Sequence, residues 1–335
     1  MTNNESIFET LAQDINSSNL SEQDKRKMLG NLAKMRSSQI NLMITGATGC
    51  GKSSTINAMF NSNMATVGEG ADPETMSISK YEYGNLILWD SPGLGDGREN
   101  DIRHSKNIID KLNERDSDGN MLIDLVLVIL DGGSRDLGTS YELINSVIIP
   151  NLGPDKDKRI IVAINQADMA MKGKYWNYEE HRPEPKLEQF LNEKAESVKK
   201  RIFEATGVSV EPIYYSAGYT ENGEQEPPYN LSKLFLEILR HTPEKKRIIY
   251  VDNVNREKQM WENNDDVQEY NKEIRRSLGE SVARGVVEGS SVGGDIGESL
   301  GGIFGRHGAA VGKAIGTVVG GVFGAIGGFF EGLFG

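Results

Sequence analysis

The sequence has few of the features that mark a secreted protein or a nucleic-acid-binding protein. Among 335 residues there is one cysteine, Cys50, so no disulfide can form within the chain, which suits a reducing compartment. Residues 1–9 are polar and acidic and lack the basic start and apolar run of a secretory signal. Lys and Arg number 37 against 49 Asp and Glu, a formal net charge of -12. This balance disfavours general affinity for nucleic acid or anionic lipid, so we expect a cytoplasmic protein with no nucleic-acid partner.

Residues 46–53 read G-A-T-G-C-G-K-S and match the phosphate-binding pattern G-x-x-x-x-G-K-[ST]. Gly46 and Gly51 permit a backbone that turns successive N–H groups onto a phosphate. Lys52 brings a positive charge to the β- and γ-phosphates, and Ser53 offers a hydroxyl to Mg²⁺. Cys50 occupies a variable position, where small size explains it, with a reactive thiol as the alternative. The pattern predicts a nucleoside-triphosphate site formed by Gly46, Ala47, Thr48, Gly49, Cys50, Gly51, Lys52, Ser53 and Ser54.

Strand and helix patterns alternate from residue 40 to residue 241. This alternation predicts an α/β fold, a mostly parallel six-stranded sheet with helices on both faces. In such folds, ligands bind at the carboxyl ends of the strands. The expected strands are 40–45, 77–83, 86–90, 123–130, 159–165 and 212–216, and the expected helices are 52–62, 101–114, 139–149, 186–206 and 231–241. Two short amphipathic helices are expected within residues 5–36, the second with Ser21 as its N-cap.

Three further motifs fall at such strand ends. Asp90-Ser-Pro-Gly93 offers a carboxylate for Mg²⁺ and a glycine N–H to sense the γ-phosphate. Asn165-Gln-Ala-Asp168 places a carboxylate that can accept two hydrogen bonds from guanine, which adenine cannot donate, so Asp168 favours GTP over ATP. Ser216 and Ala217 follow the last expected strand, and the N–H of Ala217 is the candidate donor to guanine O6.

An effector-loop threonine is expected to complete the Mg²⁺ site. Thr75, just before the strand 77–83, is the preferred candidate, and Thr66 is the alternative. The predicted metal ligands are therefore Ser53, Thr75 and Asp90, and the predicted catalytic residues are Lys52, Thr75 and Gly93.

The phrases G-A-T-G-C-G-K-S-S-T-I-N-A, L-W-D-S-P-G-L-G-D-G and I-N-Q-A-D resemble those of Era-like P-loop GTPases, in particular the bacterial YfjP/YeeP-type GTPases. The resemblance covers residues 38–242 and implies a GTP/GDP switch that uses Mg²⁺. Gln166 stands where the usual N-K-x-D pattern has lysine, which predicts lower nucleotide affinity with the same base choice.

The expected catalytic machinery is incomplete in two places. Leu94 stands where Ras-like proteins have the glutamine that orients the attacking water, and Gly49 stands where some relatives hold K⁺ with asparagine. We therefore expect slow intrinsic hydrolysis that a protein partner or self-association accelerates. Arg98 and Arg135 are the candidates to supply charge to a second copy, and an ordinary solvated loop arginine is the alternative for each.

Residues 172–184 form an inserted stretch with Tyr175, Trp176 and Tyr178, either a partner surface or an insertion packed on its own domain. Residues 243–278 carry both signs of charge and predict a solvated helix, which Ile248, Ile249, Val251 and Val254 seat on the preceding domain.

Glycine recurs every fourth residue in 285–305 and again in 308–332. On a helix this spacing makes a stripe that allows close helix packing, a glycine zipper. Residues 314–330 carry no charge and are near the minimum length for a membrane span. Residues 279–335 therefore predict a membrane-inserting helical hairpin, a soluble packing hairpin or a flexible tail.

These patterns predict four segments: an N-terminal helical appendage (1–37), a GTPase domain (38–242), a charged helical segment (243–278) and a Gly-rich hydrophobic tail (279–335). We expect a GTP-binding protein with slow Mg²⁺-dependent hydrolysis, a switch that controls assembly or membrane engagement through the tail. The expected partners are GTP, further copies of the chain, an unidentified protein and the inner face of a membrane. The alternative is a structural or membrane-acting oligomer with a nearly static GTP site.

Overall fold

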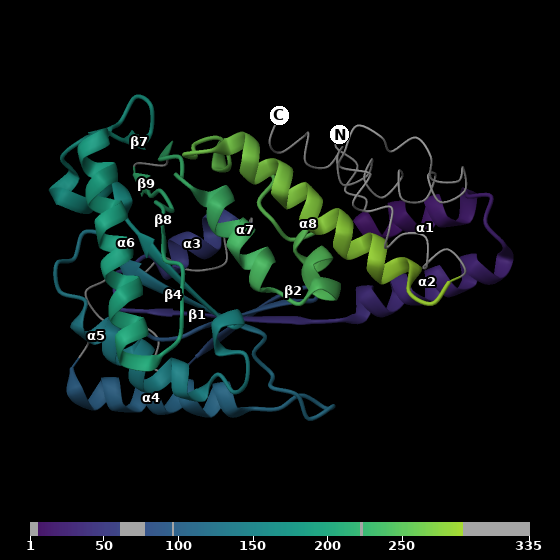
Figure 1. Ribbon diagram of the computed structural model, residues 1–335, viewed down its shortest axis with the longest axis horizontal. Coiled ribbons are helices and arrows are strands. Elements are labelled where there is room, and N and C mark those ends of the chain that lie inside the picture. The colour runs from purple at the N-terminus through teal and green to yellow at the C-terminus, as the bar shows by residue number, and fades with distance from the viewer. Residues whose placement is uncertain (1–5, 61–77, 96, 222–223, 291–335) are drawn as a thin grey trace.

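The computed structural model describes residues 6–60, 78–95, 97–221 and 224–290. Its centre is a six-stranded sheet in the order β2-β3-β1-β4-β5-β8 (Figure 1). Five strands are parallel, and the edge strand β2 runs antiparallel to β3. The strands are β1 (Ile40–Gly46), β2 (Ser79–Tyr83), β3 (Leu86–Asp90), β4 (Leu125–Asp131), β5 (Ile160–Asn165) and β8 (Ile213–Tyr214). The predicted α/β P-loop GTPase fold is confirmed.

Helices cover both faces of the sheet, because its inner strands are apolar on both sides. In β1, Leu42 and Ile44 belong to one hydrophobic core while Met43 belongs to the other. The first core lies under α3 (Lys52–Met59) and α7 (Leu231–His241), and the second lies under α4 (Arg98–Asn113) and α6 (Pro185–Thr206). This two-faced burial explains why β4 and β5 are continuous apolar runs.

The helix expected at 139–149 has an irregular course. It begins as α5 (Gly138–Glu142) and continues with π-helical geometry from Leu143 to Ile148. Leu143, Ile144 and Ile148 of this segment are completely buried in the second core. The wider π-helical turn therefore places adjacent apolar residues on the same buried face.

The N-terminal helices share the first core with the nucleotide-binding fold. They are α1 (Ile7–Ser17) and α2 (Glu22–Ser37), and Ser21 caps α2 as predicted by accepting from the Asp24 N–H at 3.1 Å. The carboxylate of Asp252 accepts bonds from Ser6 and from the Ile7 N–H, at 2.6 and 3.1 Å. The start of α1 is thereby fixed to the segment that follows the GTPase domain.

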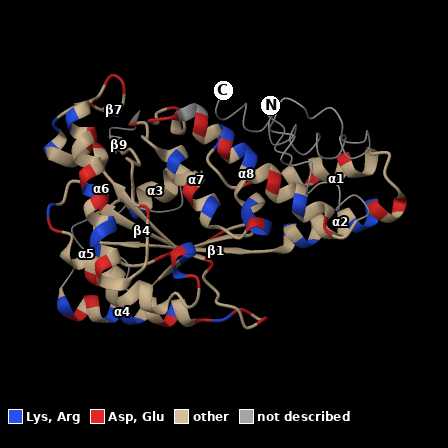
Figure 2. Ribbon diagram, viewed as in Figure 1, with Lys and Arg blue, Asp and Glu red and all other residues tan. Residues whose placement is uncertain are grey.

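The segment after residue 242 begins as a short 3-10 helix, Glu244–Tyr250, and becomes regular only in α8 (Val267–Val287). Its predicted apolar anchors are buried, Ile248, Ile249, Val251 and Val254 each being at most 2% exposed. Figure 2 shows both signs of charge along α8, whose other face packs on α2 and α7. Helix α8 is therefore amphipathic and covers part of the first core, and solvent does not surround it as the sequence predicted.

Helix α8 runs across the expected boundary at residue 279, so the first residues of the glycine-rich segment are part of a packed helix. A Cβ on Gly285 would lie 2.5 Å from the Met35 sulfur of α2, so the Met35 side chain fills the space that a larger residue would need. At Gly289 φ is +69°, a left-handed conformation that ends the helix. The Asn31 amide donates to the carbonyls of Val286 and Glu288, both at 2.9 Å, and satisfies the end of α8.

No helix within the described ranges is both long enough and apolar enough to cross a membrane. The uncharged run 314–330 and the glycines beyond residue 290 lie outside those ranges.

Replacing Gly285 and Gly30 with leucine tests the contact between α8 and α2. Gly285→Leu overpacks the contact with Met35, so we expect a loss of about 1–3 kcal/mol of unfolding free energy in chemical denaturation. Gly30 of α2 is exposed with no atom within 4 Å of an added Cβ, so Gly30→Leu serves as the matched control and gains up to about 1 kcal/mol. Equal effects at both positions would refute close packing at Gly285.

Candidate nucleotide-binding site

The phosphate loop joins the end of β1 to the start of α3, and two of its glycines are required sterically. A Cβ on Gly46 would lie 2.2 Å from the carbonyl oxygen of Ile129, on the neighbouring strand β4. A Cβ on Gly51, where φ is +89°, would lie 2.2 Å from the amide nitrogen of Asn165. No other residue fits either position without moving the loop. The loop is therefore closely packed on its outer side by the rest of the site.

Lys52 is the first residue of α3, and its ammonium group lies back over the loop. Nζ donates to the carbonyls of Gly46 and Ala47 at 3.4 and 3.2 Å. Ser53 and Ser54 follow in the first turn of the helix, whose N-terminal end carries partial positive charge. A cation, the N–H groups of the first turn of α3 and a hydroxyl thus meet at one loop, the donor set that a phosphate chain requires.

Cys50 of the same loop is completely buried. Burial raises the pKa of its thiol to about 11, against a smaller lowering by the nearby Lys52 ammonium. A neutral, enclosed thiol is a poor nucleophile. The structure therefore supports the small size of Cys50, and not reactivity, as the reason for its place in the loop.

Asp90 ends β3 beside the phosphate loop, and one of its oxygens, Oδ1, is buried without a hydrogen-bond partner among the described residues. Burial raises the pKa of this carboxyl to about 6, and Lys52 opposes the shift. A buried carboxylate oxygen with no donor is costly unless a cation binds it. Asp90 and Ser53 therefore fit a Mg²⁺ ion, while Thr75 and its alternative Thr66 lie outside the described residues.

The segment after Asp90 is tied to the phosphate loop by its backbone. The Thr48 N–H donates to the Leu94 carbonyl at 3.1 Å, and Ala47 pairs with Leu94 in a parallel bridge. A Cβ on Gly93 would lie 2.3 Å from the Thr48 hydroxyl oxygen, so only glycine allows this approach. The Leu94 side chain is 4% exposed and belongs to the second core. An apolar residue buried in this way cannot orient an attacking water.

His104 is a residue of this site that the sequence analysis missed. It lies on α4, is 2% exposed, and its Nδ1 is 3.1 Å from the Gly93 carbonyl oxygen. With its proton on Nδ1, the imidazole donates to the peptide that follows the proposed γ-phosphate sensor. The available signal was its spacing, because His104, Ile108 and Leu112 are four residues apart and share the buried face of α4.

The base-recognition motif joins three loops. Asn165, at the end of β5, donates from its amide to the Cys50 carbonyl and accepts from the Ala217 N–H, both at 2.9 Å. The buried Asp168 accepts a 2.6 Å hydrogen bond through Oδ1 from the Ser216 hydroxyl, which fixes the orientation of the carboxylate. The motif residues predicted from separate parts of the sequence are thus in direct contact. The Ala217 N–H, predicted to donate to guanine O6, donates to Asn165 in this structure.

Gln166 stands where the usual pattern has lysine, and its side chain contacts the phosphate loop. Its backbone is left-handed, with φ 59°, and its Nε2 donates to the Gly49 carbonyl at 2.9 Å. The prediction of weaker nucleotide binding was based on the missing alkyl stem and charge. The bond to Gly49 is a separate effect, because it stabilises the phosphate loop from the segment that follows β5.

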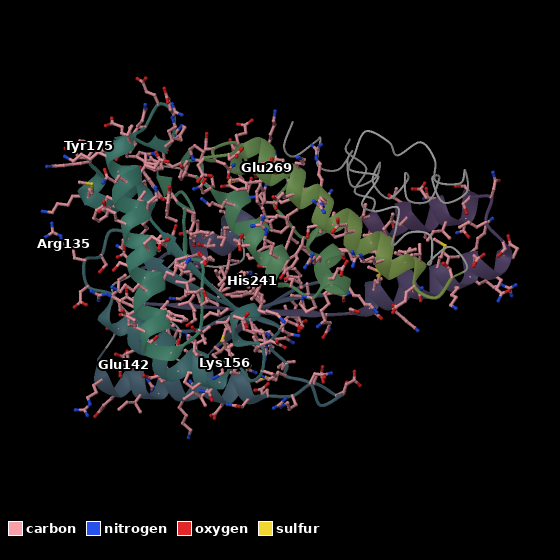
Figure 3. All side chains as sticks on the ribbon, viewed as in Figure 1. Arg135, Glu142, Lys156, Tyr175, His241 and Glu269 are labelled. Atoms are coloured by element: carbon pink, nitrogen blue, oxygen red, sulfur yellow. The ribbon has the colours of Figure 1, made fainter. Side chains whose placement is uncertain are left out.

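The two candidate arginines and the aromatic insertion have different surroundings. Arg98 is exposed at the start of α4, and Arg135 is exposed in the loop after β4, where Figure 3 labels it at the edge of the molecule. In the insertion Trp176 is buried and packs edge-to-face on Tyr229, with ring centroids 5.4 Å apart. Tyr178 is 54% exposed. Trp176 therefore anchors the insertion on its own domain, while Tyr178 remains available to a partner.

The fold and these motifs define a P-loop GTPase domain. Residues 41–166 match the family model described as 50S ribosome-binding GTPase. That match starts within β1 and ends just after Asn165, so it includes the phosphate loop and the Asp90–Gly93 motif. The narrower resemblance to YfjP/YeeP-type GTPases stays a prediction.

Three of the solved structures that match part of the chain are the following. A probable GTP-binding protein engB is 20% identical over 60% of this chain and 97% of its own, with a TM-score of 0.34. A dimerization-deficient mutant of Toc33 from Arabidopsis thaliana is 15% identical over 72% of this chain and 97% of its own, with a TM-score of 0.42. Era from Aquifex aeolicus, bound to GDP and aluminium fluoride, is 18% identical over 61% and 56%, with a TM-score of 0.38. No curated protein sequence matches the chain.

Replacing Asp90 with asparagine tests whether the buried carboxylate, which has no hydrogen-bond partner on Oδ1 among the described residues, destabilises the nucleotide-free protein. The folded-state pKa of about 6 lies above the ordinary value of 3.8, so stability is lost as the pH rises through this interval and Asp90 ionises. We expect Asp90→Asn to raise the unfolding free energy of the nucleotide-free protein near neutral pH by about 1–3 kcal/mol, and to have little effect below about pH 4. The same variant should weaken Mg²⁺-dependent nucleotide binding.

The measurements are urea denaturation across this pH range and nucleotide titration with and without Mg²⁺. Asp110→Asn on α4 is the control, since Asp110 is exposed. A stability gain that does not depend on pH would argue against this role for Asp90.

Proposed function

We propose that the chain binds GTP and GDP with Mg²⁺, hydrolyses GTP slowly, and acts as a nucleotide switch. The observation that carries the proposal is the contact network of Asn165, Asp168, Ser216 and Ala217 with the phosphate loop. A carboxylate held beside a phosphate-binding loop supports selection of guanine, because N1–H and the exocyclic amine of guanine both donate to it.

Each described residue has a specific role in this proposal. The loop 46–53 holds the phosphates through its N–H groups, and Lys52 neutralises their charge as it exchanges carbonyl contacts for phosphate oxygens. The Gly93 N–H donates to the γ-phosphate while His104 holds the carbonyl of the same residue. A bound Mg²⁺ would supply charge neutralisation between Ser53 and Asp90, and Thr75 is the proposed third ligand.

Slow hydrolysis is proposed because the structure offers no water-positioning side chain at Leu94. Acceleration then requires a group from outside the described site, either from a second copy of the chain or from a protein partner. Arg98 and Arg135 support this idea, since both are exposed and neither has an ion-pair partner among the described residues. Assembly of the chain on GTP is therefore part of the proposal.

The output is proposed to run through the glycine-rich residues 279–335, by assembly or by engagement of the inner face of a membrane from the cytoplasm. The close contact of Gly285 with Met35 supports helix packing by at least the first glycine of the series. A second candidate function is a structural or membrane-acting oligomer with a nearly static GTP site. The backbone ties between Leu94 and the phosphate loop favour this candidate, because they restrain the segment that would have to move.

Replacing Asp168 with asparagine tests the nucleotide class. The asparagine oxygen can still accept from N1–H, but its NH2 group opposes the exocyclic amine of guanine and can donate to the C2 carbonyl of xanthine. We expect GTP and GDP affinity to fall about 100-fold and xanthosine triphosphate to become the preferred ligand, as measured by calorimetry. Ser216→Ala is the companion variant, which loosens the carboxylate without removing it and should weaken GTP several-fold. Unchanged GTP affinity in Asp168→Asn would refute the proposed guanine site.

Deleting residues 291–335 tests the proposed output. This truncation leaves α8 and its Asn31 cap intact, whereas a cut at residue 279 would remove half of a packed helix. We expect the full chain with GTP to float with phospholipid vesicles or to sediment as an assembly, and the truncated chain to do neither. Turnover with and without vesicles separates the two candidates, since a static site gives the same low rate in both. If the full and truncated chains behave alike, the tail has neither role.

A further inference from the structure

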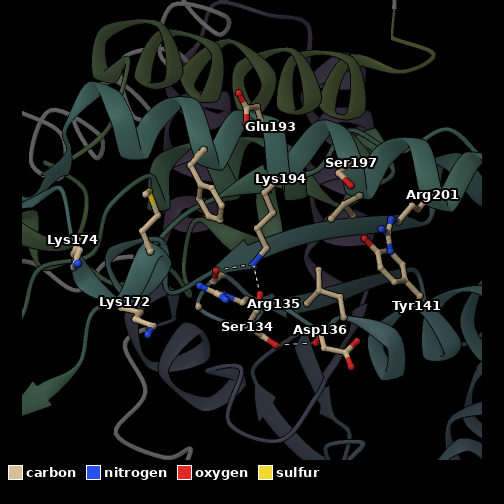
Figure 4. Close-up of a pocket in the computed structure, with 16 residues that line it drawn as sticks. Ser134, Arg135, Asp136, Tyr141, Lys172, Lys174, Glu193, Lys194, Ser197 and Arg201 are labelled. Carbon is tan, nitrogen blue, oxygen red and sulfur yellow. Dashed lines mark hydrogen bonds between the residues drawn. The ribbon is translucent and has the colours of Figure 1, made fainter.

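A cleft of about 850 Å³ opens beside the nucleotide site, between the loop that follows β4 and helix α6 (Figure 4). Four parts of the chain line it: residues 132–137, Tyr141 of α5, the residues Met171, Lys172 and Lys174, and one face of α6 from Phe190 to Arg201. None of the predicted nucleotide-binding residues is among them. The cleft is therefore a separate cavity, and its size is within the range of small-molecule sites.

The cleft is basic although the chain as a whole is acidic. Its lining holds five cationic side chains and two carboxylates, whereas the net charge of the chain is -12. Arg135, Lys172 and Lys174 are exposed and have no ion-pair or hydrogen-bond partner among the described residues. The two carboxylates have partners already, since Asp136 accepts from the Gly138 N–H at 2.8 Å and Glu193 accepts from Gln189 at 2.9 Å. These neutral donors leave both carboxylates charged, and the five cations of the lining still exceed its two anions.

Lys194 of α6 fixes the loop that follows β4, which forms one side of the cleft. Its ammonium group donates to the carbonyls of Asp131, Gly132 and Ser134, at 3.2, 2.6 and 2.7 Å. These bonds use all three of its protons, so Lys194 holds the loop in place and leaves no donor for a ligand. A fixed loop reduces the entropy that binding would otherwise lose.

The walls of the cleft are partly apolar and aromatic. Phe190 is 37% exposed, an unusual position for a phenylalanine, and the guanidinium of Arg201 stacks 5.5 Å from the ring centroid of Tyr141. Leu137 and Val198 complete the apolar lining. A ligand that fits must therefore have an aromatic or aliphatic body as well as negative charge.

We propose that this cleft binds a small amphiphilic anion, with its phosphate, carboxylate or sulfonate head on Arg135, Lys172 and Lys174 and its apolar body against Phe190 and Tyr141. The anion supplies the missing counter-charge, and its body covers the exposed ring. Free phosphate alone would leave the apolar wall in water, so it binds much more weakly.

The cleft is coupled to the base-recognition motif through shared backbone, a step that depends on the proposed nucleotide site. A Cβ on Gly132 would lie 2.4 Å from the carbonyl oxygen of Asn165, so the cleft loop packs directly on that motif. Met171 and Lys172 belong to the same irregular segment as Asp168, Ala167–Gly173, and both have left-handed φ angles of 52° and 62°. Strained backbone positions of this kind are common in ligand-binding and switch segments. Occupation of the cleft therefore changes GDP affinity, and GDP changes the affinity of the cleft by the same factor.

The test uses anilinonaphthalene sulfonate, an aromatic anion of this class, titrated into the full-length protein and followed by fluorescence and calorimetry. We expect saturable binding at one site. The double variant Arg135→Glu with Lys172→Glu should weaken it at least about tenfold, because two attractive charges become repulsive. The matched control, Arg26→Glu with Lys106→Glu on the exposed faces of α2 and α4, makes the same change in net charge and should bind like wild type.

A second variant tests the apolar wall without any change of charge. Phe190→Ser should weaken the probe several-fold while inorganic phosphate stays a poor competitor. Circular dichroism and thermal melting establish that each variant is folded. Probe affinity that is equal in the charge variant and wild type, or lost equally in the control, overturns the proposal.

The coupling is measured by GDP calorimetry with and without saturating probe. A change in GDP affinity that disappears in the charge variant supports it, and no change refutes the coupling. The probe titration needs no nucleotide, so a protein that binds probe but not GDP would contradict the proposed GTP site while leaving the cleft in place.

Discussion

The side chain of Asn165 is the contact on which the site depends. One amide bonds the phosphate loop through the Cys50 carbonyl and the last strand connection through the Ala217 N–H. These loops follow β1 and β8, which are not neighbours in the sheet, while Asn165 itself ends β5. Gly51 makes room for the amide, because a Cβ there would occupy its place. Since donor and acceptor ends of the amide are both used, neither aspartate nor leucine could replace it without leaving a buried group unsatisfied.

Other segments contact the phosphate loop on both of its sides. On one side Leu94 and Gly93 pack against Ala47 and Thr48, and His104 holds the Gly93 carbonyl. On the other side Gln166 reaches the Gly49 carbonyl. The loop is thus enclosed by the segments expected to sense the γ-phosphate and the base. Displacement of one of these contacts would therefore strain the others, so the three segments are physically coupled.

Much of the fold was predictable because its signals are local and strong. Continuous apolar runs predicted β1, β3, β4 and β5, and fixed spacings predicted the phosphate loop and the motifs after β3 and β5. The weaker predictions depended on tertiary contacts. Gly289 continues the four-residue spacing of glycines, yet it ends α8 because its φ is left-handed. His104 has no motif around it, and its role follows only from the packing of α4 beside Gly93. The basic cleft brings together residues from 132 to 201, which no sequence window contains.

One backbone bond gives the nucleotide-binding helix a mechanical link to the other end of the protein. The Asn255 N–H donates to the Met59 carbonyl at 2.8 Å, at the last residue of α3. Three residues earlier, Asp252 holds the start of α1. Residues 253 and 254, which connect these two bonds, are at least partly buried, so the connector has little conformational freedom. A displacement of α3 would therefore act on the start of α1 through this connector, and α8 would be affected through its contact with α2.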